Sequence, residues 1–302
     1  MKVFVTGASG YLGHAVAAEL ARAGHEVVGL IHTQTKAPRL AADEVRPVIG
    51  DMAEPEGWLD AARSCQAMVH CAAEMSSRFH DLDRATIDGL IGTARSANAP
   101  RLLVYTSGVW LYGDTGDGMA DESSTPAPPG MVARRVETER ALLGASGAGI
   151  RALVLRPGCL YGGGGGLTGT WFASAEEGAA RIVGHGRNRW AMVHVADVAD
   201  AYRRAVESPY SGEVFNVVDR SRFTVRECAE AAARAVGAST ELITVPASDA
   251  AAEMGPLAEC LALNQHVGAG KAARLLGWQP RHGGFVDCAD RCALAWRAHA
   301  EP

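Results

Sequence analysis

The feature that most constrains the fold of this chain is a glycine triplet close to its start. The stretch TGASGYLG places Gly7, Gly10 and Gly13 between an apolar run, KVFVT, and a segment of helical pattern, YLGHAVAAELARAG. In such a strand–turn–helix, the first glycine permits a tight turn, the second lets the backbone approach a pyrophosphate, and the third lets the helix pack against the strand. The amides at the helix start then face the anion. The triplet predicts a dinucleotide-binding βαβ unit, with a purely structural turn as the alternative.

The rest of the first half alternates between apolar runs and helical patterns. The β-branched runs are continuous, as in a parallel sheet that is covered on both faces. They occupy residues 26–32, 45–51, 67–73, 101–107 and 150–157. Helical patterns lie between them at residues 54–64, 81–97 and 132–145. We therefore predict an α/β fold, a Rossmann-type doubly wound parallel sheet, with a smaller C-terminal substrate-binding lobe.

The pattern loosens after about residue 160, and this sets the expected domain boundary. We expect residues 1–160 to form the dinucleotide-binding domain, with some later segments returning to it. Residues 161–302 are then mainly a smaller α/β substrate lobe. The stretch 113–130 is rich in Gly, Pro and acidic residues and is predicted to be a surface loop. With the glycine-rich stretch 162–166 it indicates a substrate cavity with a lid.

Charge and hydropathy exclude several classes of function. The net charge of −5 provides no basic field for nucleic acid. No run of 18 apolar residues exists, so no membrane span is expected, and the N-terminus is interpreted as a strand and not as a signal peptide. The chain has 3 Lys among its 29 basic residues, and this composition is typical of a GC-rich bacterial genome.

The cysteines point to a reducing environment. There are seven, an odd number, without CxxC spacing, so neither a disulfide framework nor a metal site is expected. We therefore predict a cytoplasmic location. Cys288 and Cys292 are four residues apart on an expected helix, where they would share one face and pack as buried thiols.

The end of the second expected strand bears on the choice of cofactor. NAD sites commonly carry an acidic residue at this point to hold the ribose hydroxyls. Here the sequence is LIHTQTKAPR, with His32 near that point and Lys36 and Arg39 shortly after it. The absence of a carboxylate removes repulsion toward a 2′-phosphate, and the cations would attract one. The sequence favours NADP (NADPH) over NAD; the alternative is that His32 is an ordinary surface residue.

Seven motifs in sequence order resemble the extended short-chain dehydrogenase/reductase superfamily, of the NAD-dependent epimerase/dehydratase type. They are TGASGYLG, GDMAEPEGW, VHCAA, VYTSGVWLYG, LRPGCLYG, VHVADVADA and LGWQP, and they span nearly the whole chain. The resemblance implies binding of a cofactor and of a small-molecule substrate, and such proteins often form homodimers. With His32 and Lys36, the expected cofactor-binding residues are Gly7, Ser9, Gly10, Tyr11, Leu12, Gly13, Asp51, Met52, Cys71, Ala72, Ala73, Thr106, Arg135, Pro157 and Gly158.

The catalytic residues that the resemblance implies are not all present. In the family a Tyr exchanges the substrate proton, a Lys four residues later lowers the Tyr pKa, and a Ser or Thr binds the substrate oxygen. An ungapped comparison places Met131 at the Tyr position, Arg135 at the Lys position and Gly108 at the hydroxyl position. The only Lys residues are at 2, 36 and 271, so no Tyr-x-x-x-Lys occurs anywhere. The chain resembles atypical branches that keep the scaffold and lose the dyad.

Other groups could serve in place of the dyad. Met131 has no ionisable proton, and Arg135 stays protonated, so neither replaces the Tyr. Arg135 can still donate forked hydrogen bonds to a ribose, a phosphate or a carboxylate; its alternative role is an ion pair with Glu139. Ser107 is the first candidate for contact with the substrate. The reserves are Tyr112 and Tyr161, and His194 is more often structural.

Three functions remain open at this point. The first is an NAD(P)-dependent oxidoreductase that acts on a small organic substrate by a non-standard proton path. Because loss of a general acid costs roughly 10²–10⁴ in rate, its acceptor would be an easy one, such as a quinone, an enone or an iminium ion. The second is a non-redox cyclase, lyase or isomerase on the same scaffold. The third is a non-catalytic NADP-binding sensor.

Overall fold

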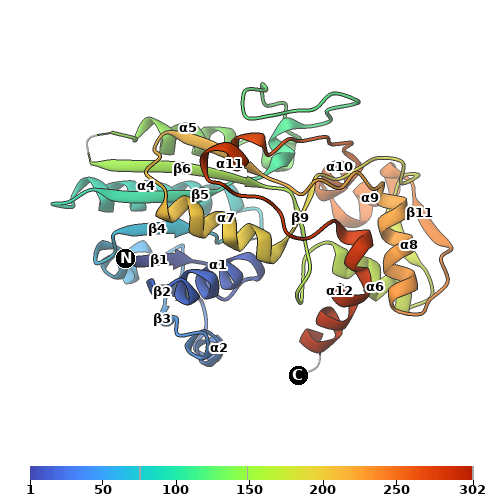
Figure 1. Ribbon diagram of the computed structural model, residues 1–302, viewed down its shortest axis with the longest axis horizontal. Coiled ribbons are helices and arrows are strands. Elements are labelled where there is room, and N and C mark those ends of the chain that lie inside the picture. Colours follow the sequence, from blue (N-terminus) through green and yellow to red (C-terminus); the bar gives the residue numbers. More distant parts are fainter. Residues whose placement is uncertain (75, 148, 301–302) are drawn as a thin grey trace. The chain divides into compact units, whose positions relative to one another are not determined.

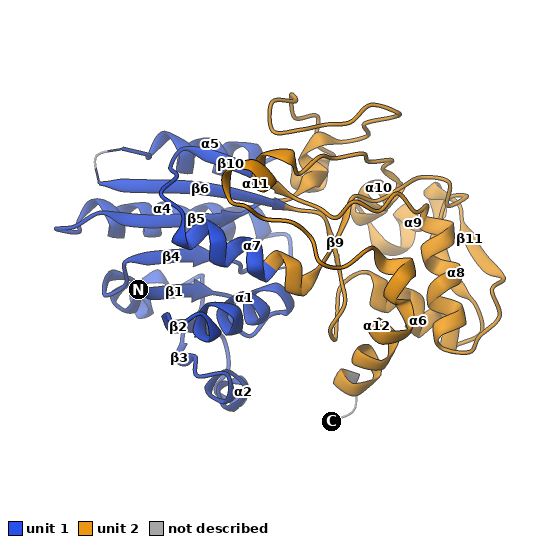
Figure 2. Ribbon diagram, in the orientation of Figure 1, with its two compact units in different colours: residues 1–107, 134–156, 199–215 blue, residues 108–133, 157–198, 216–302 orange. Residues whose placement is uncertain are grey.

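The computed structural model describes residues 1–74, 76–147 and 149–300, which form two compact units (Figures 1 and 2). The first unit consists of residues 1–107, 134–156 and 199–215. The second consists of residues 108–133, 157–198 and 216–302, of which the last two are not described. The stretch 113–130 thus belongs to the second unit, and residues 199–215 return to the first.

The first unit is built on a seven-stranded sheet in the order β10-β6-β5-β4-β1-β2-β3. The strands are β1 (Lys2–Thr6), β2 (Glu26–Ile31), β3 (Arg46–Ile49), β4 (Ala67–His70), β5 (Arg101–Thr106), β6 (Ile150–Pro157) and β10 (Glu213–Val217). The pairings from β3 through β6 are parallel. The order reverses direction between β1 and β4, which is the point where doubly wound sheets bind their ligands. The predicted α/β fold is confirmed.

Helices cover both faces of this sheet. They are α1 (Tyr11–Arg22), α2 (Ala37–Ala42), α3 (Leu59–Arg63), α4 (Phe79–Arg95), α5 (Arg135–Gly144) and α7 (Val195–Glu207). Tyr105 packs in a core cluster with Ile87 of α4 and Leu142 of α5. The next residue, Thr106, accepts a hydrogen bond from Tyr202 of α7. Because successive strand residues point to opposite faces, α4 and α5 cover one face and α7 the other.

The second unit contains two small parallel sheets and most of the C-terminal helices. β7 (Cys159–Tyr161) pairs with β9 (Met192–His194), and β8 (Ala180–Val183) pairs with β11 (Leu242–Val245). The helices are α6 (Thr168–Glu176), α8 (Val225–Ala235), α9 (Ala247–Met254), α10 (Leu257–Ala262), α11 (Gly270–Leu275) and α12 (Phe285–Ala300). A Thr224–Glu227 capping box begins α8.

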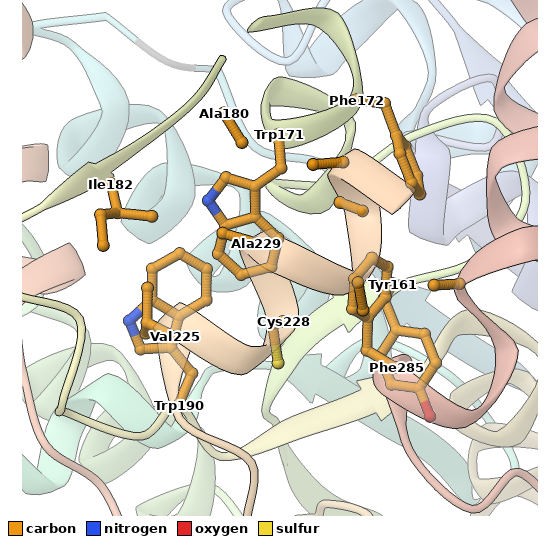
Figure 3. Packing of buried hydrophobic residues seen from close by; sticks show 14 of the residues in the cluster. Tyr161, Trp171, Phe172, Ala180, Ile182, Trp190, Val225, Cys228, Ala229 and Phe285 are labelled. Carbon is orange, nitrogen blue, oxygen red and sulfur yellow. The ribbon is translucent and has the colours of Figure 1, made fainter. Parts of the chain in front are cut away.

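Aromatic side chains fill the core of the second unit (Figure 3). The rings of Trp171 and Trp190 are stacked with their centroids 5.0 Å apart, and Phe285 packs against Trp171 and Tyr161. Each of these four side chains is at least nine-tenths buried. The residues of this cluster belong to the second unit, which therefore has a hydrophobic core of its own.

The cysteines and helices bear on two further predictions. All seven cysteines are free thiols. Cys288 and Cys292 do share a face of α12, with their sulfurs 3.6 Å apart, as predicted. No helix among the described residues combines the length and apolar character needed to cross a membrane. Within the same residues, no three His, Cys, Asp or Glu side chains are grouped to hold a metal ion.

Candidate functional site

The glycine turn between β1 and α1 has a geometry that only glycine allows. Gly7 has a φ of +66°, and its carbonyl accepts a hydrogen bond of 2.8 Å from the Gly10 amide. A Cβ on Gly7 would lie 2.6 Å from the Cα of Ala72, and a Cβ on Gly13 would lie 2.1 Å from the Gly7 oxygen. The turn is thus packed tightly against the residues after β4, and α1 begins directly after it at Tyr11.

Thr6, the last residue of β1, ties this turn to the end of β4. Its hydroxyl oxygen accepts hydrogen bonds from the amides of Cys71 and Ala72, at 3.2 and 3.3 Å. The Cys71 sulfur accepts a hydrogen bond from Thr106 at 3.5 Å, and burial raises the pKa of this thiol to about 12. Cys71 is therefore a packing group at pH 7 and not a nucleophile. The ends of β1, β4 and β5 meet here as one hydrogen-bonded edge.

Behind this edge lies a buried polar network that the sequence did not reveal. His70 Nδ1 lies 2.6 Å from the Thr6 hydroxyl, and its Nε2 lies 3.3 Å from a carboxylate oxygen of Asp83. Tyr105 donates a 2.6 Å hydrogen bond to the other oxygen of Asp83. Burial pushes the pKa of Asp83 upward, but His70, Arg135 and Tyr105 together outweigh this effect and hold the pKa below its ordinary value. The network links α4 to the strand ends through charge as well as packing.

Two buried polar atoms without hydrogen-bond partners lie next to each other at the end of β5. The backbone of Ser107 is fully used: its amide donates to Leu155, and its carbonyl accepts from Arg135 Nη1 at 3.1 Å. The guanidinium carbon of Arg135 lies 4.8 Å from the centre of the Phe79 ring. Within the described chain, the Ser107 hydroxyl and Arg135 Nε form no hydrogen bond. Such orphaned groups cost stability unless a ligand satisfies them.

The expected alternative for Arg135, an ion pair with Glu139, is wrong. Both carboxylate oxygens of Glu139 are bound by Arg156, with Nε at 2.8 Å from the first. Both partners of this pair are buried. The i, i+4 spacing on α5 indicated a contact between Arg135 and Glu139. The buried guanidinium of Arg156 binds the Glu139 carboxylate instead. Arg135 is left with Phe79 and the carbonyl of Ser107.

At the end of β2, the structure shows a carboxylate that the local sequence did not. The register of β2 and β3 pairs Ile31 with Ile49, so the chain that follows each strand runs side by side. His32 Nδ1 lies 3.7 Å from a carboxylate oxygen of Asp51, and the His32 side chain is 73% exposed. Asp51 also accepts the amide of Ala53, and its carbonyl accepts the Trp58 indole N–H. Lys36 is exposed in a short 3₁₀ turn over residues 34–36.

The remaining predicted cofactor residues fall into two groups. Ser9, Tyr11 and Leu12 lie in or beside the glycine turn and are partly buried, as is Met52 after β3, while Ala73 after β4 is exposed. The second group belongs to the other unit: Pro157 ends β6, and the Gly158 amide donates to Val217 at 3.0 Å. A Cβ on Gly158 would lie 2.5 Å from the carbonyl oxygen of Ala191, so this position also requires glycine.

The reserve candidates, Tyr112 and Tyr161, lie in the second unit, as does His194. Tyr112 donates a 2.8 Å hydrogen bond to Asn216, which itself donates to the Gly268 carbonyl. Tyr161 is fully buried, and burial raises its pKa above the ordinary value of 10. His194 stacks on His282 with ring centroids 3.6 Å apart, and burial followed by the charge of His282 lowers its pKa to about 4. Met131 is partly buried in a 3₁₀ turn over residues 130–132.

Comparisons with known proteins agree with this geometry. A model of the NAD dependent epimerase/dehydratase family matches residues 3–218. A 3-diazoavenalumate denitrifying reductase from a Streptomyces species is 30% identical, covering 95% of this chain and 98% of its own. A dTDP-glucose 4,6-dehydratase from Streptomyces venezuelae, solved as a double mutant with NAD, has a TM-score of 0.84 at 22% identity, covering 98% and 97% of the two chains. A human epimerase family protein solved with NADPH has a TM-score of 0.80 at 23% identity, covering 97% and 99%.

Proposed function

The chain belongs to the NAD dependent epimerase/dehydratase family, and from that premise we propose that it is a nicotinamide-dependent oxidoreductase whose proton path lacks the usual tyrosine. The observation that carries this proposal is the pair of orphaned buried groups, the Ser107 hydroxyl and Arg135 Nε. Both belong to the strand end and helix that the family uses for chemistry. A bound nicotinamide supplies or accepts a hydride. The substrate we propose is a small organic molecule.

The first unit has the features that a dinucleotide requires. Gly7 and Gly13 allow the turn and the helix to pack closely, and Gly10 would let a pyrophosphate approach the backbone at the start of α1. Cys71 and Ala72 lie against this turn. Arg135, at the position of the family's Lys, would hold a ribose or phosphate oxygen through its unpaired Nε. These contacts orient the cofactor and require no ionisation change in the protein.

We further propose that NADPH is the preferred nucleotide. Support comes from the exposed cation Lys36 after β2, with Arg39 on the following helix. The nearby carboxylate of Asp51, 3.7 Å from His32 Nδ1, opposes this preference. The family contains both kinds of site, since the human relative was solved with NADPH and the dehydratase with NAD. Asp51 is therefore the residue that would limit a preference for NADPH over NADH.

The choice of hydride acceptor follows from what the chain can supply. Ser107 and Arg135 can donate hydrogen bonds to a developing negative charge, but neither gives up a proton readily at pH 7. A ketone needs both a hydride and a proton to become an alcohol. An iminium ion becomes an amine with hydride alone, and an arenediazonium ion becomes an arene and N₂ with hydride alone. A relative named as a denitrifying reductase of a diazo compound supports acceptors of this kind.

The experiment that tests the proposal begins with nucleotide binding. Purified protein is titrated with NADPH and NADH while tryptophan quenching and energy transfer to the nicotinamide are followed. Saturable binding with tighter affinity for NADPH is the expected result. Absorbance at 340 nm is then followed with a quinone, an enone, an iminium ion and an arenediazonium ion.

The outcomes distinguish the three functions that the sequence left open. Consumption of NADPH with one of these acceptors supports the oxidoreductase. Binding of neither nucleotide would exclude both the oxidoreductase and the sensor. A product formed while NADPH absorbance stays constant would indicate a non-redox enzyme, and nucleotide-dependent binding of a partner without turnover would indicate a sensor.

A further inference from the structure

The second unit contains a cavity of about 230 Å³ that the proposed nucleotide site does not use. Three chain segments build most of its wall: residues 189–191 before β9, residues 218–222 after β10, and residues 265–273 leading into α11. Trp190, Val218 and Trp278 belong to the apolar part of the wall. The cavity suits a compact organic molecule.

The polar part of the wall is strongly positive. Arg189, Arg220 and Arg222 line the cavity, and Asp219 is the single carboxylate among the lining residues. The chain as a whole carries a net charge of −5, so the sign of this wall is opposite to that of the protein. A cavity of one sign with low-dielectric walls concentrates ligands of the opposite sign. The wall therefore selects anions.

Arg189 is held in place by its neighbours and keeps donors free. Its Nε donates a 2.8 Å hydrogen bond to the carbonyl of Arg222, while its backbone is fixed by Asn264 and Gln265. Its terminal guanidinium nitrogens make no hydrogen bond to the described residues. A guanidinium fixed at Nε presents its other edge as a forked donor, which matches a carboxylate. Arg222 is exposed and carries a second charge on the same wall.

Asp219, the single carboxylate of the wall, is buried at 8% exposure. One of its oxygens accepts from the amide and the hydroxyl of Ser221, at 2.8 and 2.7 Å. Its other oxygen is buried, and the Tyr161 hydroxyl interacts with the carboxyl. The donors to Asp219 therefore come from the protein, and the arginines are the charged groups that a ligand would meet.

We propose that this cavity binds a small organic acid. The carboxylate of the ligand is held by Arg189 and Arg222, and its apolar body lies against Trp190 and Trp278. All of these residues lie in the second unit. The binding test is made without nucleotide, so its outcome is separate from that of the proposed oxidoreductase activity.

The test uses isothermal titration of the full chain, without nucleotide, against a matched set of probes. The probe 4-hydroxybenzoate carries the acid, and 4-hydroxybenzamide has the same ring without the charge. We expect saturable binding of 4-hydroxybenzoate and at least about tenfold weaker binding of the amide. No saturation by about 10 mM, or equal binding of inorganic phosphate, would overturn the proposal.

Variants separate a built site from general charge attraction. Arg222→Gln removes a charge but keeps the backbone carbonyl that holds Arg189. Arg189→Gln removes the forked donor, and Arg189→Lys restores the charge alone; both are checked by near-UV circular dichroism for a native fold. Arg234→Gln removes an exposed charge on α8, outside the cavity, as the control. We expect at least about tenfold loss for R189Q, partial recovery for R189K and no change for R234Q. Equal effects of R189Q and R234Q would refute the assignment.

Discussion

At the scale of single residues, the catalytic proposal depends on one hydroxyl. Ser107→Ala removes a buried group that has no hydrogen-bond partner in the described protein, so the fold should lose little. If the hydroxyl donates to the reacting substrate, kcat for NADPH oxidation should fall by about 10²-fold, as for loss of one such donor elsewhere. The Kd for NADPH should change by less than about threefold. Stopped-flow single turnovers measure the rate, and an unchanged rate would remove Ser107 from the mechanism.

The Asp83 network makes a prediction about pH. The pKa of Asp83 in the folded state is below the ordinary value of 3.8. The ionised carboxylate of Asp83 therefore makes its full contribution to stability above pH 3.8. That contribution is lost as pH falls below this value toward the folded-state pKa. Asp83→Asn should lower the free energy of unfolding by about 1–3 kcal/mol at pH 7, because His70 and Tyr105 lose a charged partner. Urea unfolding from pH 7 to 3 should show the two proteins converging below pH 4; a constant gap would contradict the assignment.

The same residues show where sequence reasoning ends. The glycine turn was predictable because its chemistry is local: three glycines, one strand and one helix define it. The partners of Asp83 and Arg135 were not, because they are set by packing between elements distant in sequence. In the sequence, Asp83 resembles an ordinary polar residue of an amphipathic helix. Glu139 lies four residues after Arg135, which is the spacing of an ion pair on a helix surface. Whether Ser107 and Arg135 act on substrate stays a prediction.

At the scale of elements, the β1–α1 unit depends on the contact between Gly13 and Gly7. Gly13→Ala would place a Cβ 2.1 Å from a backbone oxygen that cannot move aside without shifting the turn. We expect a cost of about 1–3 kcal/mol and loss of nucleotide binding. Gly92→Ala on α4 is the matched control, because nothing lies within 4 Å of its Cβ position. It should be neutral or stabilise by up to about 1 kcal/mol in thermal unfolding. Retained NADPH affinity in G13A would disprove the role of the turn.

Elements in the first half were predictable and several in the second were not, for a physical reason. The strands of the large sheet are runs of four to eight residues, and all the predicted runs contain one. β7 and β9 have three residues each, which is too short to show a period of two. α12 contains a non-helical residue at Cys288, which breaks its pattern. The strand β10 comes long after the other strands of the large sheet in sequence, and only the structure shows that it joins them.

At the scale of the whole molecule, the chain passes from one unit to the other five times along its length. A fragment of residues 1–160, the expected nucleotide domain, would therefore lack residues 199–215 of the first unit. It would lose β10, the neighbour of β6, and the hydrogen bond from Tyr202 on α7 to Thr106. Loss of β10 would leave β6 as an unpaired edge. Loss of α7, whose Ala201 and Ala205 are buried in the full chain, would uncover the face of the sheet that this helix covers.

We accordingly expect the fragment 1–160 to aggregate or to lack a cooperative unfolding transition, whereas the full chain unfolds cooperatively. Denaturant unfolding followed by circular dichroism and tryptophan fluorescence, with size-exclusion chromatography, measures the difference. Adding residues 195–217 to the fragment through a flexible linker should restore cooperativity, because it returns α7 and β10 to the unit. A fragment 1–160 that unfolds cooperatively and binds NADPH would show that the nucleotide unit ends where the sequence pattern loosens. In that case the return of α7 and β10 would be an addition to a unit already complete.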